Sequence, residues 1–381
     1  MPAFETWIAN RTRGFDSSGI RRMFDLAAKL KDPINLSIGQ PDFDVPPPVK
    51  SELIRAVEEG KNGYAATQGM PVLREKLQAD VDSQLGHEDR ELFVCSGTSG
   101  GLFLAVLATI NPGDEVIYFD PFFVMYPAMI EMAGGKSVKI STYPNFKIDI
   151  EKVKAAITPK TKMIILNSPS NPTGICPAME EIKAVAELAH ERGICLVSDE
   201  IYSKFTYDQP HVSAATYNPD TIVIDGFSKT YAMTGWRVGY VHGPAELMQT
   251  MLKIQQYTFV CAPQPAQWAG AAAMDVDMAA GPDVGLYTDM RDLRAWLEPY
   301  WGGSSVLNTF SFTGAFSVAA ALGGASEIVS VDCSAPIVAR SEHNFRANGL
   351  DPAAHDFLVQ DVWKALDRFR RTGRRFDRVV I

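Results

Sequence analysis

The chain of 381 residues is 46% hydrophobic, 21% charged and 10% aromatic, which is typical of a folded globular protein and excludes a disordered or fibrous one. Its length predicts two or three domains with sizeable cores. The formal net charge of −9 argues against a general nucleic-acid or membrane-surface role for the whole molecule.

The cysteines and the N-terminal residues indicate a cytoplasmic protein. Cysteine stands at positions 95, 176, 195, 261 and 333, and no two of these form a Cys-x-x-Cys pair. An odd number without such pairs is typical of reduced thiols and favours neither disulfides nor a zinc site, so no metal is expected. No stretch is long and apolar enough to span a membrane, and residues 1–5 lack the basic start of a signal peptide.

Short apolar runs alternate with segments of helical period between about residue 50 and about residue 270. Strands are expected at Leu92–Ser96, Glu115–Phe119, Met163–Asn167, Ile194–Ser198, Thr221–Asp225 and Val238–His242. Helices are expected at Val49–Glu59, Val72–Leu85, Gly101–Ile110, Ala178–Arg192 and Ala245–Gln256. This alternation predicts an α/β fold with a mostly parallel sheet between helices, and a ligand site beyond the carboxyl ends of the strands.

The chain divides into three segments in this interpretation. Residues 1–44 form an N-terminal arm that ends in a stretch rich in proline and aspartate, and residues 45–280 form the α/β domain. Residues 281–381 hold 1 lysine and 10 arginines, against 16 lysines and 9 arginines before them. This change in the choice of basic residue indicates a boundary between segments of different origin.

Lys229 stands shortly after the strand expected at Thr221–Asp225, in a run that carries no other charge until Arg237. Most lysines are solvated surface residues, but a lysine in such a run is expected to be shielded from water. Shielding lowers the pKa of the amine and favours Schiff-base chemistry.

A carboxylate and a phenol follow another strand. Asp199 comes directly after the apolar run Ile194–Ser198, and Tyr202 lies three residues later. Taken alone, Asp199 is explained better by a helix N-cap or a turn. A carboxylate at this place can also keep the pyridine nitrogen of pyridoxal phosphate protonated, while Tyr202 donates to the phenolic oxygen of the ring.

A phosphate site is expected where Gly97, Thr98 and Ser99 close one strand and open a helix, because backbone N–H groups point at an anion there. Arg237 adds a charge-assisted fork for the same phosphate. Asn171 lies in an Asn-Pro-Thr-Gly sequence, which is also typical of a plain turn. Each signal is weak alone, but their order and spacing together indicate a pyridoxal phosphate site.

Residues 1 to about 280 resemble the class I and II aminotransferases of pyridoxal phosphate fold type I. The matching segments are Gly39–Phe43, Asn62–Tyr64, Asn171–Gly174, Asp199–Tyr202 and Ser228–Gly239. The resemblance implies a three-layer αβα large domain, a homodimer, and transfer of an amino group between an amino acid and a 2-oxo acid through a Schiff base on Lys229.

The same resemblance implies a role for each residue. The catalytic residues are Lys229, Asp199 at the pyridine nitrogen, and Tyr202. The cofactor is further held by Gly97, Thr98, Ser99, Phe123 (stacked on the ring), Asn171, Arg237, and Tyr64, which reaches the phosphate of the partner subunit. Gly39 and Asn171 face the substrate. Gly226 departs from the family, in which many members carry a phosphate-binding serine at this position.

The family's last hundred or so residues contain an arginine, in an Arg-x-Ser-aromatic context, that clamps the substrate carboxylate. No Arg-x-Ser-Phe or Arg-x-Ser-Tyr sequence occurs in this chain. The C-terminal segment instead predicts a strand, a glycine-bearing turn, a helix and a second strand that ends at Asp332, which is typical of a nucleotide-binding βαβ unit or of a βαβ unit without ligand.

This segment resembles the S-adenosylmethionine-binding half of class I rRNA (cytosine) methyltransferases, a partial Rossmann-like domain in place of the usual small domain. The resemblance implies that the loop from Asn308 to Gly314 surrounds the methionine part, with Asp332 on the ribose and Asp361 near the adenine. The family's Asp-Pro-Pro catalytic motif does not occur after Asp377. RNA is implied as a partner only through this segment, at its arginine-rich end, where a solvated helix face explains the arginines better.

The sequence thus favours a chimeric chain, joined near residues 279–284, with aminotransferase function. A β-elimination lyase that shares the fold remains an alternative, since no residue separates the two reactions. Two further hypotheses for the function of the chain are a methyltransferase fragment and a folded protein without catalytic activity.

Overall fold

The computed structural model describes residues 4–15, 39–41, 43–86, 90–207, 210–276 and 291–380. These residues form two compact units, one ending at Asp275 and the other beginning at Val276. The join expected near residues 279–284 lies outside the described residues. No helix in the described ranges is long and apolar enough to cross a membrane.

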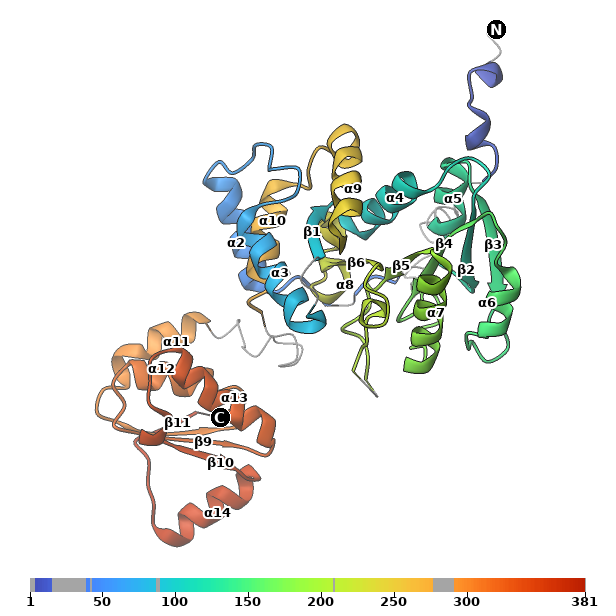
Figure 1. Ribbon diagram of the computed structural model, residues 1–381. Coiled ribbons are helices and arrows are strands. Elements are labelled where there is room, and N and C mark those ends of the chain that lie inside the picture. The colour runs from blue at the N-terminus through green and yellow to red at the C-terminus, as the bar shows by residue number, and fades with distance from the viewer. Residues whose placement is uncertain are drawn as a thin grey trace, which may run out of the picture. The chain divides into compact units, whose positions relative to one another are not determined.

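The first unit contains most of the secondary structure (Figure 1). Its strands are β1 (Arg90–Cys95), β2 (Glu115–Asp120), β3 (Lys136–Ser141), β4 (Thr161–Asn167), β5 (Cys195–Asp199), β6 (Ile222–Gly226) and β7 (Gly239–Pro244). Its α-helices are α2 (Pro47–Glu58), α3 (Pro71–Leu85), α4 (Gly97–Thr109), α5 (Met125–Met132), α6 (Ile150–Ala156), α7 (Met179–Arg192), α8 (Phe227–Thr230), α9 (Ala245–Thr258) and α10 (Gln264–Ala273). The arm contributes two short 3₁₀ helices, η1 (Phe4–Thr6) and η2 (Asn10–Thr12).

The seven strands form one sheet in the order β1-β7-β6-β5-β4-β2-β3. Strand β7 runs antiparallel to both of its neighbours, and the other pairs are parallel. The prediction of a mostly parallel sheet is therefore confirmed. Because β4, β5 and β6 are adjacent and parallel, their carboxyl ends meet at one edge of the sheet, where a ligand site is expected.

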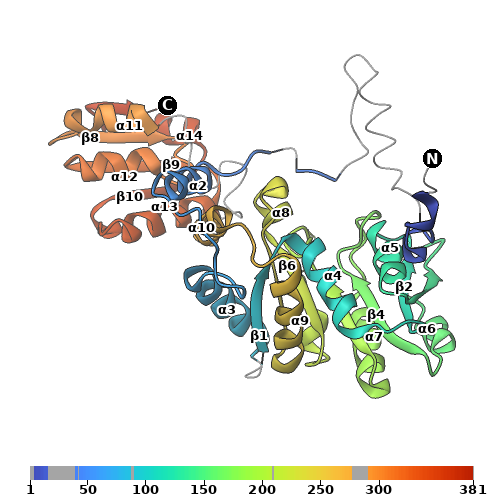
Figure 2. The same cartoon turned by 90° about the horizontal axis from the view of Figure 1, so that it is seen from above.

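Helices cover both faces of this sheet, so its central strands are apolar throughout. On β4, Met163 and Ile165 pack into a core shared with α4, α5 and α9. The alternate residues Ile164 and Leu166 pack into a second core with α6 and α7. All four side chains are at most 1% exposed. Helices α4 and α9 lie side by side on their face (Figure 2).

The expected strands and helices are present with shifts of a few residues at their ends. The largest shift is at α4, which begins at Gly97 rather than at Gly101. In the first unit, strand β3 and the α-helices α5, α6, α8 and α10 were not expected. Strand β3 lies at the edge of the sheet and buries only Ile140, so its sequence shows no apolar run.

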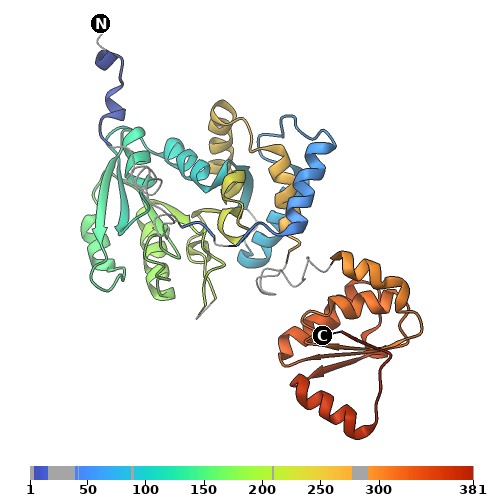
Figure 3. The same ribbon diagram turned by 180° about the vertical axis from the view of Figure 1, so that it is seen from behind.

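The second unit is a smaller parallel sheet with helices on both faces (Figure 1, Figure 3). Its elements are α11 (Arg291–Leu297), β8 (Ser305–Thr309), α12 (Ala315–Leu322), β9 (Glu327–Asp332), α13 (Ala335–Ala347), β10 (Asp356–Val359), α14 (Val362–Thr372) and β11 (Arg378–Val380). The strand order is β10-β9-β8-β11, and every pair is parallel. This order confirms the expected Rossmann-like unit.

Two cores hold this sheet between its helices. Val306 and Ile328 pack with Phe345 of α13 on one face, and α12 covers the same face. Leu307 and Val329, the next residues along each strand, pack against α14 on the other face. The carboxyl ends of β8, β9 and β10 therefore form an open edge from which the loops 310–314 and 332–334 start.

Candidate active site

The parallel strands bring the predicted carboxylate and its neighbours to one edge of the large sheet. Asn167 is the last residue of β4 and Asp199 is the last residue of β5, and the two are paired in the register of the sheet. Lys229 follows β6 by three residues, on the short helix α8. Residues separated by more than 60 positions in sequence thus stand at adjacent strand ends.

Asp199 is almost completely buried, at 3% exposure. Its Oδ2 accepts a hydrogen bond of 2.8 Å from the hydroxyl of Tyr126, which is itself buried on α5. Burial raises the pKa of Asp199 to about 6, while the hydrogen bond from Tyr126 lowers it. A buried carboxylate held in one orientation is suited to pairing with a cationic group, since the pair gains more in a site without water.

Tyr202 and Asn171 meet beside this carboxylate. The Asn171 Nδ2 donates to the Tyr202 hydroxyl at 3.3 Å. Asn167 supports both segments, because its Oδ1 accepts from the backbone N–H of Asn171 at 2.6 Å and its Nδ2 donates to the carbonyl of Asp199 at 2.9 Å. The pKa of Tyr202 is raised by burial and by the nearby charge of Asp199, so the phenol keeps its proton for donation.

The amine of Lys229 faces this group. Its Nζ lies 5.7 Å from the centre of the Tyr202 ring and donates a hydrogen bond to the carbonyl of Gly39. Burial lowers the pKa of Lys229, and the charge of Arg237 lowers it further, while Asp199 opposes the shift. A lowered pKa increases the fraction of neutral amine, which is the nucleophilic form.

The predicted phosphate residues form a compact cradle at the start of α4. A Cβ on Gly97 would lie 2.5 Å from a guanidinium nitrogen of Arg237, and the backbone of Gly97 has a φ of +68°. Thr98 lies close to Gly226, whose added Cβ would meet its methyl group at 3.4 Å. Since α4 has 13 residues, its N-terminal N–H groups and the helix dipole favour an anion next to Arg237. Ser99 lies in the first turn of the same helix.

Two predicted residues occupy different places relative to this group. The ring of Phe123 packs edge-on against Tyr126, with the ring centres 5.7 Å apart. It therefore lies next to the hydrogen-bonded pair of Tyr126 and Asp199. Tyr64 is 87% exposed on the surface of the unit. The position of Phe123 suits stacking on the cofactor ring, whereas the exposed side chain of Tyr64 can reach another molecule.

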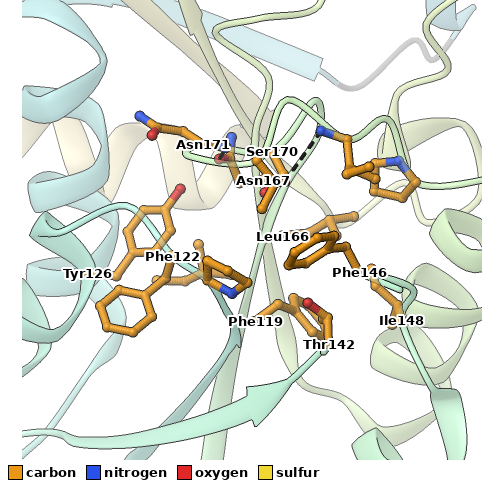
Figure 4. A pocket seen from close by; sticks show the side chains of 15 residues that line it. Phe119, Phe122, Tyr126, Thr142, Phe146, Ile148, Leu166, Asn167, Ser170 and Asn171 are labelled. Atoms are coloured by element: carbon orange, nitrogen blue, oxygen red, sulfur yellow. Dashed lines mark hydrogen bonds between the residues drawn. The ribbon is translucent and has the colours of Figure 1, made fainter. Parts of the chain in front are cut away.

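A small cavity adjoins the site at the ends of β2, β3 and β4 (Figure 4). Tyr126 and Asn171 line one side of it, and Phe122, Phe146 and Leu166 line much of the rest. Its volume is about 30 Å³, which is enough for a water molecule but not for an amino acid.

Sequence reasoning missed Tyr126 and gave Asn167 no role. Tyr126 follows Phe123 by three residues, and in the turn that leads into α5 its N–H donates to the carbonyl of Phe123 at 3.1 Å. Its burial and its bond to Asp199 depend on α5 packing over β4 and β5, and the sequence did not reveal α5 at all.

The residues fit pyridoxal 5′-phosphate in their donor set and in the space that they leave. The amine, the buried carboxylate, the phenol and amide pair, and the arginine at a helix N-terminus match the aldehyde, pyridine nitrogen, ring oxygen and phosphate of this cofactor. Gly97 and Gly239 let Arg237 and β7 approach the start of α4 closely, because a Cβ on Gly239 would lie 2.8 Å from the backbone nitrogen of Thr98.

The open edge of the second unit is organised around Asp332, the last residue of β9. Its Oδ2 accepts from the backbone N–H of Phe312 and its Oδ1 from that of Ser334, both at 3.1 Å. Phe310 and Phe312 have φ values of +52° and +48°, which are costly for residues with a side chain. The carboxylate thus holds a strained loop, a feature found at ligand sites.

The other predicted residues of this unit are bound within it. Asn308 is 3% exposed, and its Nδ2 donates to the Ser317 hydroxyl of α12 at 2.8 Å. The amide therefore forms its hydrogen bond inside the unit. Gly314 caps α12 with a φ of +78°, where a Cβ would meet Ser341 Oγ at 1.9 Å. Asp361 caps α14 by accepting from the N–H of Lys364 at 3.0 Å. These three residues therefore shape the edge of the sheet.

Fold and site together define a pyridoxal phosphate-dependent transferase of fold type I. Residues 31–285 match the model of the family described as aminotransferase class I and II. The chain belongs to this aminotransferase family, whose members move an amino group between an amino acid and a 2-oxo acid, and the same activity is assigned to it. Residues 268–381 match the model described as S-adenosylmethionine-dependent methyltransferase, which agrees with a chimeric arrangement.

Individual proteins support the same assignment. A probable aspartate aminotransferase of Methanocaldococcus jannaschii is 43% identical over 275 residues, which are 70% of this chain and 73% of the relative. The aspartate/prephenate aminotransferase of Thermus thermophilus is 40% identical over 281 residues, 71% of this chain and 73% of the relative. The structure of aspartate aminotransferase from Thermus thermophilus with maleate aligns with a TM-score of 0.68 and 34% identity, covering 78% of this chain and 81% of that one.

Proposed function

We propose that the first unit binds pyridoxal 5′-phosphate through Lys229 and carries out amino-group transfer with the residues gathered at the ends of β4, β5 and β6. The single observation that carries this proposal is the position of the Lys229 amine over the Tyr202 ring, with its pKa lowered by burial. The bound cofactor supplies an electron-withdrawing ring that stabilises negative charge at the substrate Cα.

Each residue has one task in this proposal. Asp199 keeps a proton on the pyridine nitrogen, and Tyr126 orients its carboxylate. Tyr202 and Asn171 donate to the ring oxygen, while the start of α4 and Arg237 bind the phosphate. Lys229 would hold the aldehyde of the cofactor, and its Nζ, as a free amine, would serve as the base and acid that moves the proton of the substrate Cα.

The substrate carboxylate is held less firmly here than by a paired arginine. The sequence contains no Arg-x-Ser-aromatic motif, and the groups proposed for the carboxylate are the backbone at Gly39 and the amide of Asn171. Hydrogen bonds to charged groups contribute about 1.5–3 kcal/mol each, so losing the two bonds of a bidentate pair weakens amino acid binding by at least about a hundredfold. We therefore expect a high KM for amino acids.

A homodimer is proposed from the surface beside the phosphate cradle. Tyr64 is 87% exposed and Tyr257 is 82% exposed, and Phe259 and Val260 are also exposed at the end of α9. The Phe259 ring reaches within 4.0 Å of a Cβ built on Gly100 of α4. Exposed aromatic side chains clustered at a ligand site favour a protein interface. Sedimentation of wild type and Tyr257→Glu tests this, with dissociation expected for the variant.

The transfer reaction is tested by titrating the cofactor-loaded protein with aspartate, the amino acid in the names of several relatives. The visible band of lysine-bound pyridoxal phosphate should disappear, and addition of 2-oxoglutarate should restore it. A β-elimination lyase would instead release ammonia from a substrate with a leaving group and need no 2-oxo acid. A band that persists with aspartate, together with ammonia release from a substrate that carries a leaving group, would contradict the transfer reaction and favour that alternative.

A second activity, binding of S-adenosylmethionine, is proposed for the second unit. The observation that favours it is the Ser311 hydroxyl, which is buried in the loop held by Asp332 and has no partner among the residues that the structure describes. A buried unsatisfied hydroxyl costs free energy unless a ligand completes its bonding. Calorimetric titration of the full chain with S-adenosylmethionine tests this, and no heat at millimolar ligand would contradict it.

RNA remains a proposed partner only for α14 and the residues after it. Arg370 and Arg371 are paired with Asp367, and Arg374 is paired with Glu327 and Asp356. Internal pairing reduces the charge available to phosphates, so weak and strongly salt-dependent binding is expected. A filter-binding assay with a short rRNA hairpin at two salt concentrations measures it.

A further inference from the structure

Asp225 lies on β6, next to Gly226 and four residues before Lys229, and the roles assigned above do not include it. Its Oδ1 accepts from the backbone N–H of Gly226 at 2.6 Å. Its Oδ2 accepts from the Ser203 hydroxyl at 3.0 Å and from the Tyr240 hydroxyl at 3.4 Å. One carboxylate therefore bridges three segments, which are the turn after β5, the end of β6, and β7.

Two of these segments carry groups of the cofactor site. Ser203 directly follows Tyr202 in the turn formed by residues 201–204, called the Tyr202 turn below. Gly226 is the N-cap of α8, the helix that carries Lys229. The Lys229 amine lies 5.7 Å from the centre of the Tyr202 ring, so a small shift of either segment changes the separation of phenol and amine.

Few other hydrogen bonds join the Tyr202 turn to the end of β6 among the residues that the structure describes. One backbone bond joins them at the preceding position, from the Glu200 N–H to the Ile224 carbonyl at 2.8 Å. Beyond it, the chain on this side borders a cleft of about 550 Å³ that Asp225, Ser203 and Tyr240 help to line. Ile201 anchors the turn on its buried side, and on the side of the cleft the Ser203 hydroxyl is held by its hydrogen bond to Asp225.

The close approach of β7 explains why the next residue cannot perform this task. A Cβ on Gly226 would lie 2.8 Å from the Cα of Gly239 and 3.1 Å from the Val238 carbonyl. Gly226 therefore brings no side chain to the site, and the neighbouring carboxylate is left as the side-chain link between the Tyr202 turn and α8.

We propose that Asp225 is a positioning residue whose carboxylate joins the Tyr202 turn to the helix that carries Lys229, and so fixes the phenol relative to the amine that holds the cofactor. This inference rests on the proposed pyridoxal phosphate function. It adds a residue that acts through Ser203 and Gly226 and that does not touch the cofactor.

The charged and titratable groups around Asp225 come from several elements. They are Glu200, Lys204, His211, Tyr231, Tyr240, His242 and, on α3, Asp80. Glu200 is paired with His211 at 2.9 Å, and burial lowers the pKa of His242 to about 3, so that this ring is neutral. The hydrogen bonds of Asp225 come from Gly226, Ser203 and Tyr240, while Lys204 and His211 act on its carboxylate through their charge.

Four variants of the full chain separate bridging from general stability. Asp225→Ala removes both arms of the bridge, and Ser203→Ala removes only the arm to the Tyr202 turn. Asp225→Asn keeps the shape, since its Oδ1 still accepts from Gly226 and its amide donates to the Ser203 and Tyr240 hydroxyls. Tyr240→Phe is the matched control, because it removes a hydrogen bond to the same carboxylate without affecting the Tyr202 turn.

The measurements are the pyridoxal phosphate Kd from absorbance titration, the pH midpoint of the lysine-bound absorption band, and the melting temperature. One lost hydrogen bond of about 1 kcal/mol predicts a Kd weakened about fivefold in Ser203→Ala and about tenfold in Asp225→Ala, each with a shifted pH midpoint. Asp225→Asn should restore both values. Tyr240→Phe should lower the melting temperature but leave Kd and midpoint unchanged.

The inference is overturned if Ser203→Ala and Asp225→Ala both keep the wild-type Kd and midpoint, or if Tyr240→Phe changes them as much as Ser203→Ala does. Should Asp225→Ala fail to fold, Ser203→Ala decides the question alone, since it removes a single hydroxyl. Failure of the underlying function looks different, because wild type and Lys229→Ala would then give the same spectrum.

Discussion

Two aspartates, Asp199 and Asp332, stand at equivalent places in the two sheets, each as the last residue of a parallel strand. The surroundings of their carboxylates differ. Asp199 is 3% exposed and accepts from a buried tyrosine, and burial raises its pKa to about 6. Asp332 is only half-buried, and its two oxygens accept from the backbone N–H groups of Phe312 and Ser334.

This difference shows how one topological position serves two chemistries. A carboxylate without water and with a side-chain donor is suited to a permanent cationic partner, such as a protonated ring nitrogen. A carboxylate that organises its own loop and stays accessible is suited to neutral hydroxyl groups, such as those of a ribose. Strand order sets where the ligand binds, and the surroundings of the carboxylate determine which ligand it is.

The largest effect is expected from removing the first carboxylate. Asp199→Ala leaves the pyridine nitrogen without its partner, so the rate of amino-group transfer should fall about 10²–10³-fold. Single-turnover absorbance with aspartate measures it. Asp220→Ala, which removes an exposed carboxylate elsewhere in the unit, is the control. A fall of less than about threefold would remove the distinction drawn between the two aspartates.

The second prediction concerns stability and pH in the cofactor-free protein. The pKa of Asp199 is raised from 3.8 to about 6, so its contribution to stability is present below pH 3.8 and is lost as pH rises through about 6. Asp199→Asn removes this loss and should raise the free energy of unfolding at pH 8 by up to about 3 kcal/mol, but hardly at pH 4. Urea unfolding measures this free energy. An equal change at pH 8 and at pH 4 would contradict the claim that burial raises the pKa of Asp199.

A third prediction compares one glycine from each unit. Gly226→Ser brings a Cβ to 2.8 Å from the Gly239 Cα, and Gly314→Ala brings one to 1.9 Å from Ser341 Oγ at a φ of +78°. Each should destabilise by about 1–3 kcal/mol, and Gly226→Ser should not improve cofactor binding. Calorimetry should show each change in the transition of its own unit. Tighter pyridoxal phosphate binding in Gly226→Ser would contradict the crowding between β6 and β7.

The smallest effect is expected at the second carboxylate. Asp332→Ala removes the acceptor for the loop and for the proposed ribose, and should weaken S-adenosylmethionine binding about tenfold by calorimetry. Asp351→Ala, a change at the cap of an exposed 3₁₀ helix, serves as the control. If Asp332→Ala binds as wild type does, the loop is not a ligand site of the kind proposed.

The sequence alone predicted the sheet and most of the site, because these features produce local signals. Apolar runs that are buried on both faces revealed β4 and β5, and Asp199, Lys229 and Arg237 stood out against them. Strand β3 was missed because it lies at the edge and buries only Ile140. Polar and exposed residues there leave no pattern that separates a strand from a loop.

The support of the site was beyond the reach of sequence patterns. Tyr126 belongs to it only because α5 packs where its hydroxyl meets Asp199, 73 positions away in the chain. The bridge from Ser203 to Asp225 spans 22 positions and joins the Tyr202 turn to strand β6 through side chains. Such contacts depend on the assembled sheet, and the residues that make them have ordinary types and ordinary neighbours in sequence.

The central claim is that Lys229 holds the cofactor at the edge formed by β4, β5 and β6. The most direct test is the visible spectrum after addition of pyridoxal 5′-phosphate to wild type, Lys229→Ala and the control Lys204→Ala. Wild type and Lys204→Ala should show the band of lysine-bound cofactor and keep it after gel filtration, whereas Lys229→Ala should show only free cofactor that the column removes. A band of equal strength in Lys229→Ala would contradict the account.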